Sequence, residues 1–400
     1  MKVGIVLESL EMGGMQTVLK SLALFFRSLG HIVDFIEVES RGKWADYFRT
    51  LDFQVHAVPE RWYVSKYAHA REIARQLSAY DVLLLNDVPV AQASLGLLPP
   101  EVIVIPVIHL DMPSFISNAA GNFGQWNRVV TVSPVLKEKF IKSTGIGQEY
   151  VEFISNAVDF PEVTSPPPAQ EMNRLHLLFL GRIENNQKGV FLLPEIMKSA
   201  ATGPKPLFLH VVGDGPDLGQ LKGRFSEAGL TNVKFYGSLL HDQALEIMKS
   251  SRLLLMPSYF EGMPIALLEA MSQGVVPLVS RLELSTDYIV EQEKNGYLVE
   301  PGDVAGFAAR IVESVEHPER LDKMSRAARD TVQKRFTTRF MGEHYLEVIR
   351  EARQSGLSAP IRRTNAVKVE LLGEYPRLPV GLIRPIRKIM RGLVLNSAGS

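Results

Sequence analysis

Cysteine is absent from the 400 residues of this sequence. Without a thiol, the chain can form no disulfide, hold no zinc-thiolate site and use no cysteine nucleophile. Long apolar runs are missing as well, because no uninterrupted apolar segment reaches membrane-spanning length. The opening Lys2–Leu7 reads as a strand and lacks the basic and apolar regions of a signal peptide. We therefore expect a soluble, cytoplasmic protein that is at most peripheral at the inner face of a membrane.

Net charge is the third absence. The 44 Lys and Arg residues equal the 44 Asp and Glu residues, which argues against a general nucleic-acid binder. Apolar residues make up 46% of the chain, enough for large cores. Because 400 residues exceed what one core usually organises, we expect two domains.

Strand-like apolar runs alternate with helical patterns in both halves of the chain. This alternation is typical of an α/β fold with parallel sheets covered on both faces. A proline cluster at 161–169 predicts a stiff extended linker. The expected organisation is an N-terminal domain at 1–160, this linker, a C-terminal domain at 170–336, a helix at 337–353 and a basic tail at 354–400.

The most informative stretch runs from Ser258 to Gly274. It follows an apolar strand and places Glu261 in a loop, with Pro264 at the start of a helix and Glu269 inside that helix. Loops after parallel strands border the ligand crevice of doubly wound sheets, and helix N-termini there favour anions. Two carboxylates beside an anion site could accept hydrogen bonds from an anion that also carries hydroxyl groups. Alternatively, Glu261 is an ordinary loop carboxylate and Glu269 points at water.

Three further loops carry candidate binding groups. Arg182 and Lys188 lie in a glycine-bounded loop after a strand, where two cations can bracket a diphosphate, although incidental charges in a solvated loop would look the same. The Gly13-Gly14 pair between the first strand and helix would let a phosphate approach the backbone, or would form a simple turn. His109 ends another strand and can bind a hydroxyl or cap its loop.

Taken together, these motifs resemble the retaining GT-B glycosyltransferases of family four, the group 1 type. The resemblance covers residues 1 to 353 and includes Glu261 and Glu269 with seven residues between them, Gly-Met-Pro after the first, and Gly-Arg with Lys-Gly upstream. It implies two Rossmann-like domains facing each other across a cleft that holds the active site. The implied reaction moves a sugar from a nucleoside-diphosphate donor to the hydroxyl of a sugar, lipid-linked or small-molecule acceptor, with neither metal nor cofactor.

The resemblance also implies roles for single residues. Four are expected to be catalytic and five to bind the donor. The catalytic set is Arg182, Lys188, Glu261 and His109, and the donor-binding set is Gly14, Gly262, Met263, Pro264 and Glu269. Polysaccharide or glycolipid assembly is the expected setting. A nucleotide-sugar epimerase of similar fold and a catalytically silent sugar-binding protein are the alternatives.

Two segments depart from the family pattern. Ala157 replaces a usual glycine, and Arg281–Ile289 replaces a usual glycine-containing loop, which leaves the role of Glu283 undecided. The tail after Ser358 is basic, and residues 385–394 would form an amphipathic helix with a basic face. Such a helix can lie on an anionic membrane, dock on its own protein or stay disordered.

Overall fold

The structure is a computed structural model that describes all residues except 12, 161–173, 355–363, 365, 369–371, 373–377 and 379–400. The chain divides into two compact units, 1–154 with 342–400 and 155–341. The sequence placed the corresponding boundaries at 160 and 336. The predicted linker at 161–169 and most of the predicted tail lie outside the described residues.

The described part of the N-terminal unit contains a seven-stranded sheet in the order β3-β2-β1-β4-β5-β6-β7. All neighbouring strands pair in parallel. The strands are β1 (Lys2–Leu7), β2 (Ile32–Glu37), β3 (Gln54–Ala57), β4 (Val82–Asn86), β5 (Ile103–Ile108), β6 (Val129–Thr131) and β7 (Val151–Phe153). The order changes direction between β1 and β4, the place where doubly wound sheets open a crevice for ligands.

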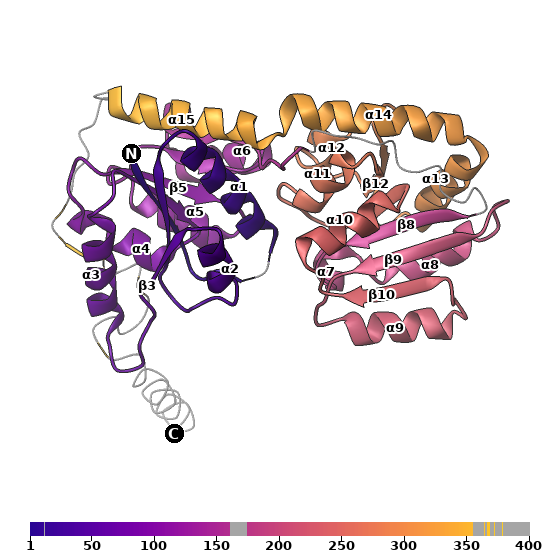
Figure 1. Cartoon of the computed structure of the whole chain (residues 1–400), viewed down its shortest axis with the longest axis horizontal. Coiled ribbons are helices and arrows are strands. Elements are labelled where there is room, and N and C mark those ends of the chain that lie inside the picture. The colour runs from indigo at the N-terminus through magenta and orange to yellow at the C-terminus, as the bar shows by residue number, and fades with distance from the viewer. Residues whose placement is uncertain are drawn as a thin grey trace, which may run out of the picture. The chain divides into compact units, whose positions relative to one another are not determined.

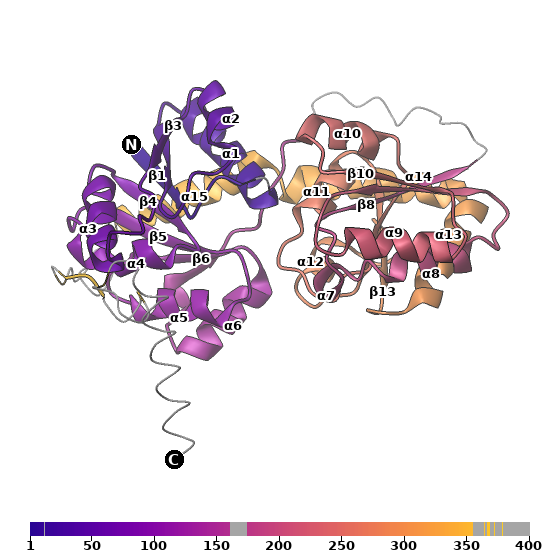
Figure 2. The same cartoon turned by 90° about the horizontal axis from the view of Figure 1, so that it is seen from below.

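Helices flank this sheet, as Figures 1 and 2 show. They are α1 (Gly14–Ser28), α2 (Ala45–Thr50), α3 (Lys66–Leu77), α4 (Pro89–Ala93), the 3₁₀ turn η1 (Leu95–Leu97), α5 (Pro113–Gly121), α6 (Pro134–Thr144) and the 3₁₀ turn η2 (Gln148–Tyr150). In α1, Val18, Leu22 and Phe26 are buried at helical spacing, so one apolar face packs on the sheet. Strand β4 is buried along its whole length, as expected of a central strand covered on both faces.

The described part of the C-terminal unit contains a six-stranded sheet in the order β10-β9-β8-β11-β12-β13. Its strands also pair in parallel. They are β8 (Leu175–Leu180), β9 (Leu207–Val212), β10 (Val233–Gly237), β11 (Leu253–Met256), β12 (Val276–Ser280) and β13 (Tyr297–Val299). The order changes direction between β8 and β11. The predicted α/β class with two doubly wound parallel sheets is therefore confirmed.

The helices of the C-terminal unit lie on its sheet in the same way (Figure 2). They are α7 (Asn185–Lys188), α8 (Leu192–Ala200), α9 (Leu218–Glu227), α10 (His241–Lys249), α11 (Ile265–Ser272), α12 (Thr286–Ile289), α13 (Val304–Glu316) and α14 (Pro318–Arg335). The segments before and after this unit's core run side by side, because Val158 donates its N–H to Phe336 O and accepts from Thr338 N–H.

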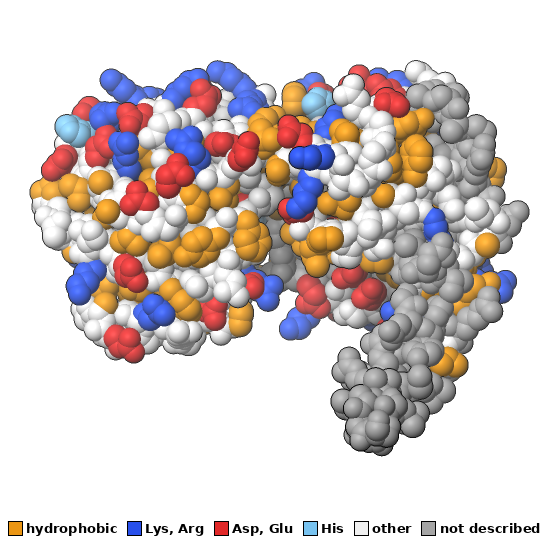
Figure 3. Space-filling model, turned by 180° about the vertical axis from the view of Figure 1, so that it is seen from behind, with side chains coloured by type: hydrophobic (Ala, Val, Ile, Leu, Met, Phe, Trp, Pro, Cys, Tyr) orange, Lys and Arg blue, Asp and Glu red, His pale blue; other side chains and the backbone are white. Residues whose placement is uncertain are grey.

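The last described helix, α15 (Thr338–Gln354), passes from one unit into the other. Its Gly342 lies against Phe25 of α1, where an added Cβ would be only 2.1 Å from the ring. A glycine is therefore required at this contact. Within the described residues, no helix has both the length and the apolar character to cross a membrane. On the face drawn in Figure 3, side chains of both charge signs are interspersed.

Candidate active site

The β11–α11 loop is built as the sequence predicts, with one shift at the helix start. Strand β11 ends at Met256 and α11 begins at Ile265. Pro264 is the N-cap rather than the first helical residue, because its ψ of 110° is extended. Its carbonyl still accepts hydrogen bonds from Leu267 and Leu268. The helix ends near Gly274, whose φ of +80° closes the turn.

Lys188 and Glu261 form the closest pair among the predicted site residues. Lys188 Nζ lies 2.7 Å from Glu261 Oε1 and 2.9 Å from Oε2. The hydroxyl of Ser258 donates to the same Oε1 at 2.7 Å. Both charged side chains are largely buried, with 17% of the lysine and 5% of the glutamate exposed. Glu261 is therefore held in place by Lys188 and Ser258, and its role in binding a donor sugar stays a prediction.

Two backbone features hold the lysine loop against the glutamate loop. Tyr259 N–H donates to Gln187 O at 2.8 Å. Gly189 adopts a left-handed φ of +60°, and a Cβ there would come within 2.1 Å of Pro257 O. The end of α7 thus packs directly on the residues after β11, which explains why a glycine must follow Lys188.

Arg182 is far more exposed to solvent than Lys188. Its side chain is 67% exposed, and its Nε lies 3.3 Å from Glu184 Oε2. The residue follows β8, one strand away from β11 in the sheet order. The guanidinium is therefore available to an anion at the carboxyl end of the sheet, and its role in a diphosphate clamp stays a prediction.

Glu269 lies inside α11 and does not point freely at water. Only 12% of its side chain is exposed, and its Oε1 lies 3.5 Å from His241 Nδ1. His241 is the first residue of α10. The sequence reasoning missed this histidine, although its position at the start of a helix that follows a strand was a usable signal.

The loop residues Gly262, Met263 and Pro264 are fixed by bonds to their carbonyls. Ser285 Oγ donates to Gly262 O at 2.7 Å, and Asn156 Nδ2 donates to Met263 O at 3.3 Å. Ser285 belongs to the stretch that departs from the family pattern. Its supporting role could not be read from the sequence, because the contact joins segments that are separated along the chain.

The two remaining predicted residues belong to the N-terminal unit. Gly14 is the first residue of α1, and Gly13 is its N-cap, so the glycine pair forms a helix start and not only a loop. His109 follows β5, and its Nε2 lies 2.9 Å from Asn86 Oδ1. Burial lowers the pKa of His109 to about 4, so the ring is neutral at pH 7. It is a hydrogen-bonding group there and not a cation.

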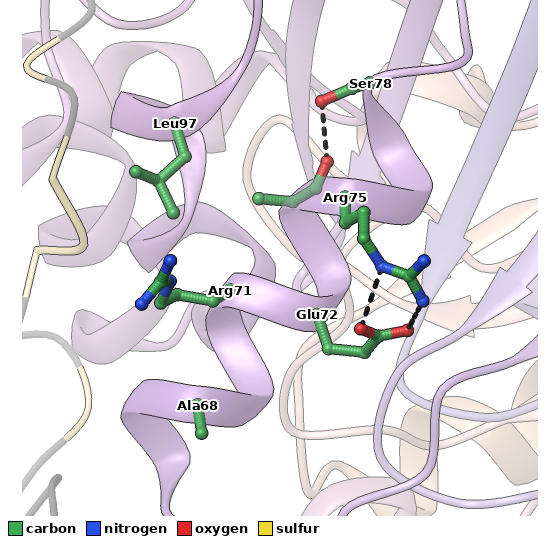
Figure 4. A pocket seen from close by; sticks show the side chains of 7 residues that line it. Ala68, Arg71, Glu72, Arg75, Ser78 and Leu97 are labelled. Carbon is green, nitrogen blue, oxygen red and sulfur yellow. Dashed lines mark hydrogen bonds and ion pairs between the residues drawn. The ribbon is translucent and has the colours of Figure 1, made fainter.

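A separate hollow of 550 Å³ lies on the outer side of α3. Figure 4 shows Arg75 bonded to Glu72, with Arg71 on the side of Leu97. None of the predicted site residues lines this hollow. Within the described residues, no cluster of three or more metal-ligating side chains is present.

The matches to known proteins agree with this geometry. The family model described as "Glycosyl transferases group 1" matches residues 164–331, which include Arg182, Lys188, Glu261 and Glu269. Residues 164–331 are therefore similar to the group 1 glycosyl transferases.

A curated relative is also similar to part of the chain. The chain is 31% identical over 187 residues to the lipopolysaccharide 1,6-galactosyltransferase of Escherichia coli K12, covering 46% of this chain and 50% of the relative. The match thus spans about half of the length of that relative.

Solved structures show the same fold. A glycosyltransferase from Rickettsia africae aligns with a TM-score of 0.75 at 15% identity, over 89% of this chain and 99% of that one. Anabaena HepE, solved in complex with UDP and glucose, aligns with a TM-score of 0.73 at 17% identity, over 88% of this chain and 100% of that one. These likenesses show that the chain has the GT-B fold, with two Rossmann-like domains.

Proposed function

We propose that this protein is a retaining, metal-independent glycosyltransferase that moves a hexose from a nucleoside-diphosphate sugar to an acceptor hydroxyl. The observation that carries the proposal is the enclosed Lys188–Glu261 pair at the carboxyl end of the C-terminal sheet. A cation and a carboxylate held together at this edge match the two parts of an activated sugar, an anionic diphosphate and a hydroxyl-bearing ring.

Each charged group has a task in such a reaction. The leaving diphosphate gains negative charge as the sugar bond breaks, and Lys188 and Arg182 would stabilise that charge. Glu261 would accept hydrogen bonds from hydroxyls of the donor sugar. Glu269 would accept hydrogen bonds from the ribose hydroxyls, with His241 fixing the orientation of its carboxylate. Gly262, Met263 and Pro264 line the same strand-to-helix turn.

The relatives suggest a first donor and an acceptor class. The matched Escherichia coli protein is a galactosyltransferase of lipopolysaccharide, and Anabaena HepE was solved with UDP and glucose. UDP-galactose and UDP-glucose are therefore the first donors to test. We place the reaction in the assembly of a polysaccharide or glycolipid, in the cytoplasm or at the inner face of a membrane.

The experiment uses the full chain with a panel of sugar nucleotides, with and without acceptors. Thermal unfolding first identifies the nucleotide, because a ligand at a hundredfold its Kd stabilises by about 2.7 kcal/mol. Nucleotide release that increases with acceptor supports transfer, and an α-linked product from an α-linked donor supports retention. Conversion of the donor sugar without acceptor would instead indicate an epimerase. Nucleotide or sugar binding with neither reaction would indicate a silent binding protein.

A further inference from the structure

The carboxyl edge of the N-terminal sheet carries an acidic residue after each of four neighbouring strands. In sheet order, Glu60 follows β3, Glu39 follows β2, Glu8 follows β1 and Asp87 follows β4. Backbone bonds join three of these strand ends, because Glu60 N–H donates to Glu39 O at 2.9 Å and Glu39 N–H donates to Glu8 O at 3.1 Å. The row ends at the switch between β1 and β4, where doubly wound sheets bind ligands.

Asp87 is the unusual member of this row. Its φ of +50° is left-handed. This conformation is uncommon outside glycine, and strained backbone residues of this kind cluster at functional sites. The residue is only 8% exposed. Its Oδ2 accepts a hydrogen bond from His109 N–H at 3.1 Å. Its Oδ1 is buried and has no hydrogen-bond partner within the described residues. Most buried polar atoms in folded proteins have such a partner, so this exception calls for an explanation.

The neighbours of Asp87 leave this oxygen as the unsatisfied group. The amide of Asn86 donates to Val6 O and Leu84 O, both at 3.1 Å. The Asn86 Oδ1 atom can therefore only accept a hydrogen bond. Because His109 Nε2 lies 2.9 Å from it, this ring nitrogen carries a proton and donates it to Asn86 Oδ1. Asn86 and His109 are bonded to each other, while Asp87 Oδ1 has no partner within the described residues.

We propose that Asp87 Oδ1 binds an oxygen of the uncharged sugar portion of the acceptor substrate. This inference rests on the proposed glycosyl transfer and adds the acceptor side to it. The acidic row selects the class of ligand, because carboxylates repel phosphates and carboxylic acids but hydrogen-bond readily with hydroxyls.

The protonation state of Asp87 decides whether its Oδ1 donates or accepts a hydrogen bond. The pKa of Asp87 is raised to about 8, mainly by burial; the His109 N–H opposes the rise and the charge of Glu8 adds to it. At pH 7 the carboxyl is therefore neutral. Because Oδ2 accepts the backbone bond, the proton resides on Oδ1, which donates to the acceptor oxygen.

The groups around Glu8 and Glu39 are mainly acidic. Burial, and then the nearby Glu39, raise the pKa of Glu8. Burial and Glu60 also raise the pKa of Glu39, while Lys66 and His69 lower it. The His109 ring is neutral, as described above. No cation in this set is positioned by a hydrogen bond to Asp87.

Two substitutions separate a binding role from a structural one. Asp87→Asn keeps the left-handed backbone, which asparagine tolerates, and places an amide donor where the Oδ1 proton was. Asp87→Gly removes the side chain without backbone strain. The matched control is Asp34→Asn on β2, a buried aspartate whose Oδ2 is bonded by Tyr80 and lies 3.4 Å from Lys2 Nζ.

The assay uses UDP-galactose and UDP-glucose as donors, methyl glycosides of neutral hexoses as acceptor probes, and hexose 6-phosphates as the anionic comparison. We expect transfer to the neutral probes only. The acceptor KM of the wild type should rise as the pH passes through about 8, whereas Asp87→Asn should keep a low, pH-independent acceptor KM. Asp87→Gly should raise the acceptor KM about tenfold at pH 7, as for one lost hydrogen bond, and leave the donor KM within about twofold.

Thermal unfolding supplies a readout that needs no ligand. A neutral amide avoids the cost of keeping a carboxyl protonated, so Asp87→Asn should raise the Tm at pH 8, while Asp34→Asn should lower it. The proposal is overturned if Asp87→Gly changes both KM values alike or neither, if Asp87→Asn retains the wild-type pH dependence, or if only phosphorylated probes react. Donor cleavage in water without binding of any neutral probe also overturns it. Absence of any donor cleavage in the wild type rejects the proposed function itself.

Discussion

Lys188 Nζ contacts both carboxylate oxygens of Glu261, at 2.7 Å and 2.9 Å. In the free protein, the cation expected to hold the diphosphate is thus the partner of the carboxylate expected to hold the sugar. Both side chains are largely buried, so little water replaces a missing partner. Donor binding must redistribute these contacts, and the first two predictions follow from this competition.

Removing the cation should affect both stability and turnover. In Lys188→Ala, Glu261 keeps a buried charge without its main partner, which should lower the free energy of unfolding by about 3 kcal/mol. Turnover should fall by at least about tenfold, because a charge-stabilising group at the leaving diphosphate is lost. Chemical denaturation and steady-state kinetics measure the two effects. Lys198→Ala, an exposed lysine on α8, is the control, and near-normal turnover of Lys188→Ala would refute the clamp.

Removing the carboxylate charge should have opposite effects on binding and catalysis. In Glu261→Gln, Lys188 no longer has an anionic partner, so a free nucleoside diphosphate should bind about fivefold more tightly, equal to about 1 kcal/mol. Turnover should nevertheless fall, because the amide holds the sugar hydroxyls less well. Calorimetry with UDP and GDP provides the affinities. Weaker diphosphate binding in this variant would show that the two groups do not compete.

The sequence was sufficient for the fold because the evidence for it is local and repeated. Apolar strands, amphipathic helices such as α1 and glycine-ended turns predict two doubly wound sheets, and both are present. The apolar run before Ser258, together with Pro264 and Gly274, likewise predicted a strand, a loop and a helix in the right order. These features depend on the residues of one segment, so the segment itself reveals them.

The contacts that shape the site were not predictable in the same way. The Ser258 and Ser285 bonds, the His241–Glu269 contact and the unpaired Asp87 oxygen all depend on which side chains meet in space. The sequence placed Arg182 and Lys188 together in one loop, yet one is enclosed and the other exposed. Such differences arise from how neighbouring strands position their loops, which no single motif contains.

Arg182 should behave differently from Lys188 because its side chain is mostly exposed. Arg182→Ala should leave the Tm unchanged, since an exposed ion pair such as the one with Glu184 contributes little. Turnover should still fall by at least about tenfold if the guanidinium binds the leaving diphosphate. Arg326→Ala, an exposed arginine on α14, is the matched control. Equal activity of the two variants would remove Arg182 from the site.

Glu269 and His241 should act as one unit in nucleotide binding. Glu269→Gln and His241→Ala should each weaken binding of the nucleotide by about tenfold, as expected for one or two hydrogen bonds to ribose. The double variant should lose less than the sum of the two free energies, because the residues contact each other. Calorimetry with a nucleoside diphosphate and its 2′-deoxy analogue tests the role. Equal discrimination against the deoxy analogue by wild type and Glu269→Gln would contradict it.

His109 should make the stability of the N-terminal unit depend on pH. Burial lowers the pKa of His109 to about 4 from 6.5, so the unfolded chain takes up a proton at a higher pH than the folded one. Stability should therefore fall as the pH decreases from about 6.5 to about 4, by about 3 kcal/mol, and should level off below that. The raised pKa of Asp87 contributes an opposite slope throughout this range, so the effect must be read as a difference between variants. His109→Gln, which keeps a donor toward Asn86 but cannot be charged, should remove the His109 contribution, while the exposed His317→Gln should not. Parallel pH profiles for wild type and His109→Gln would show that the ring takes up a proton equally in both states.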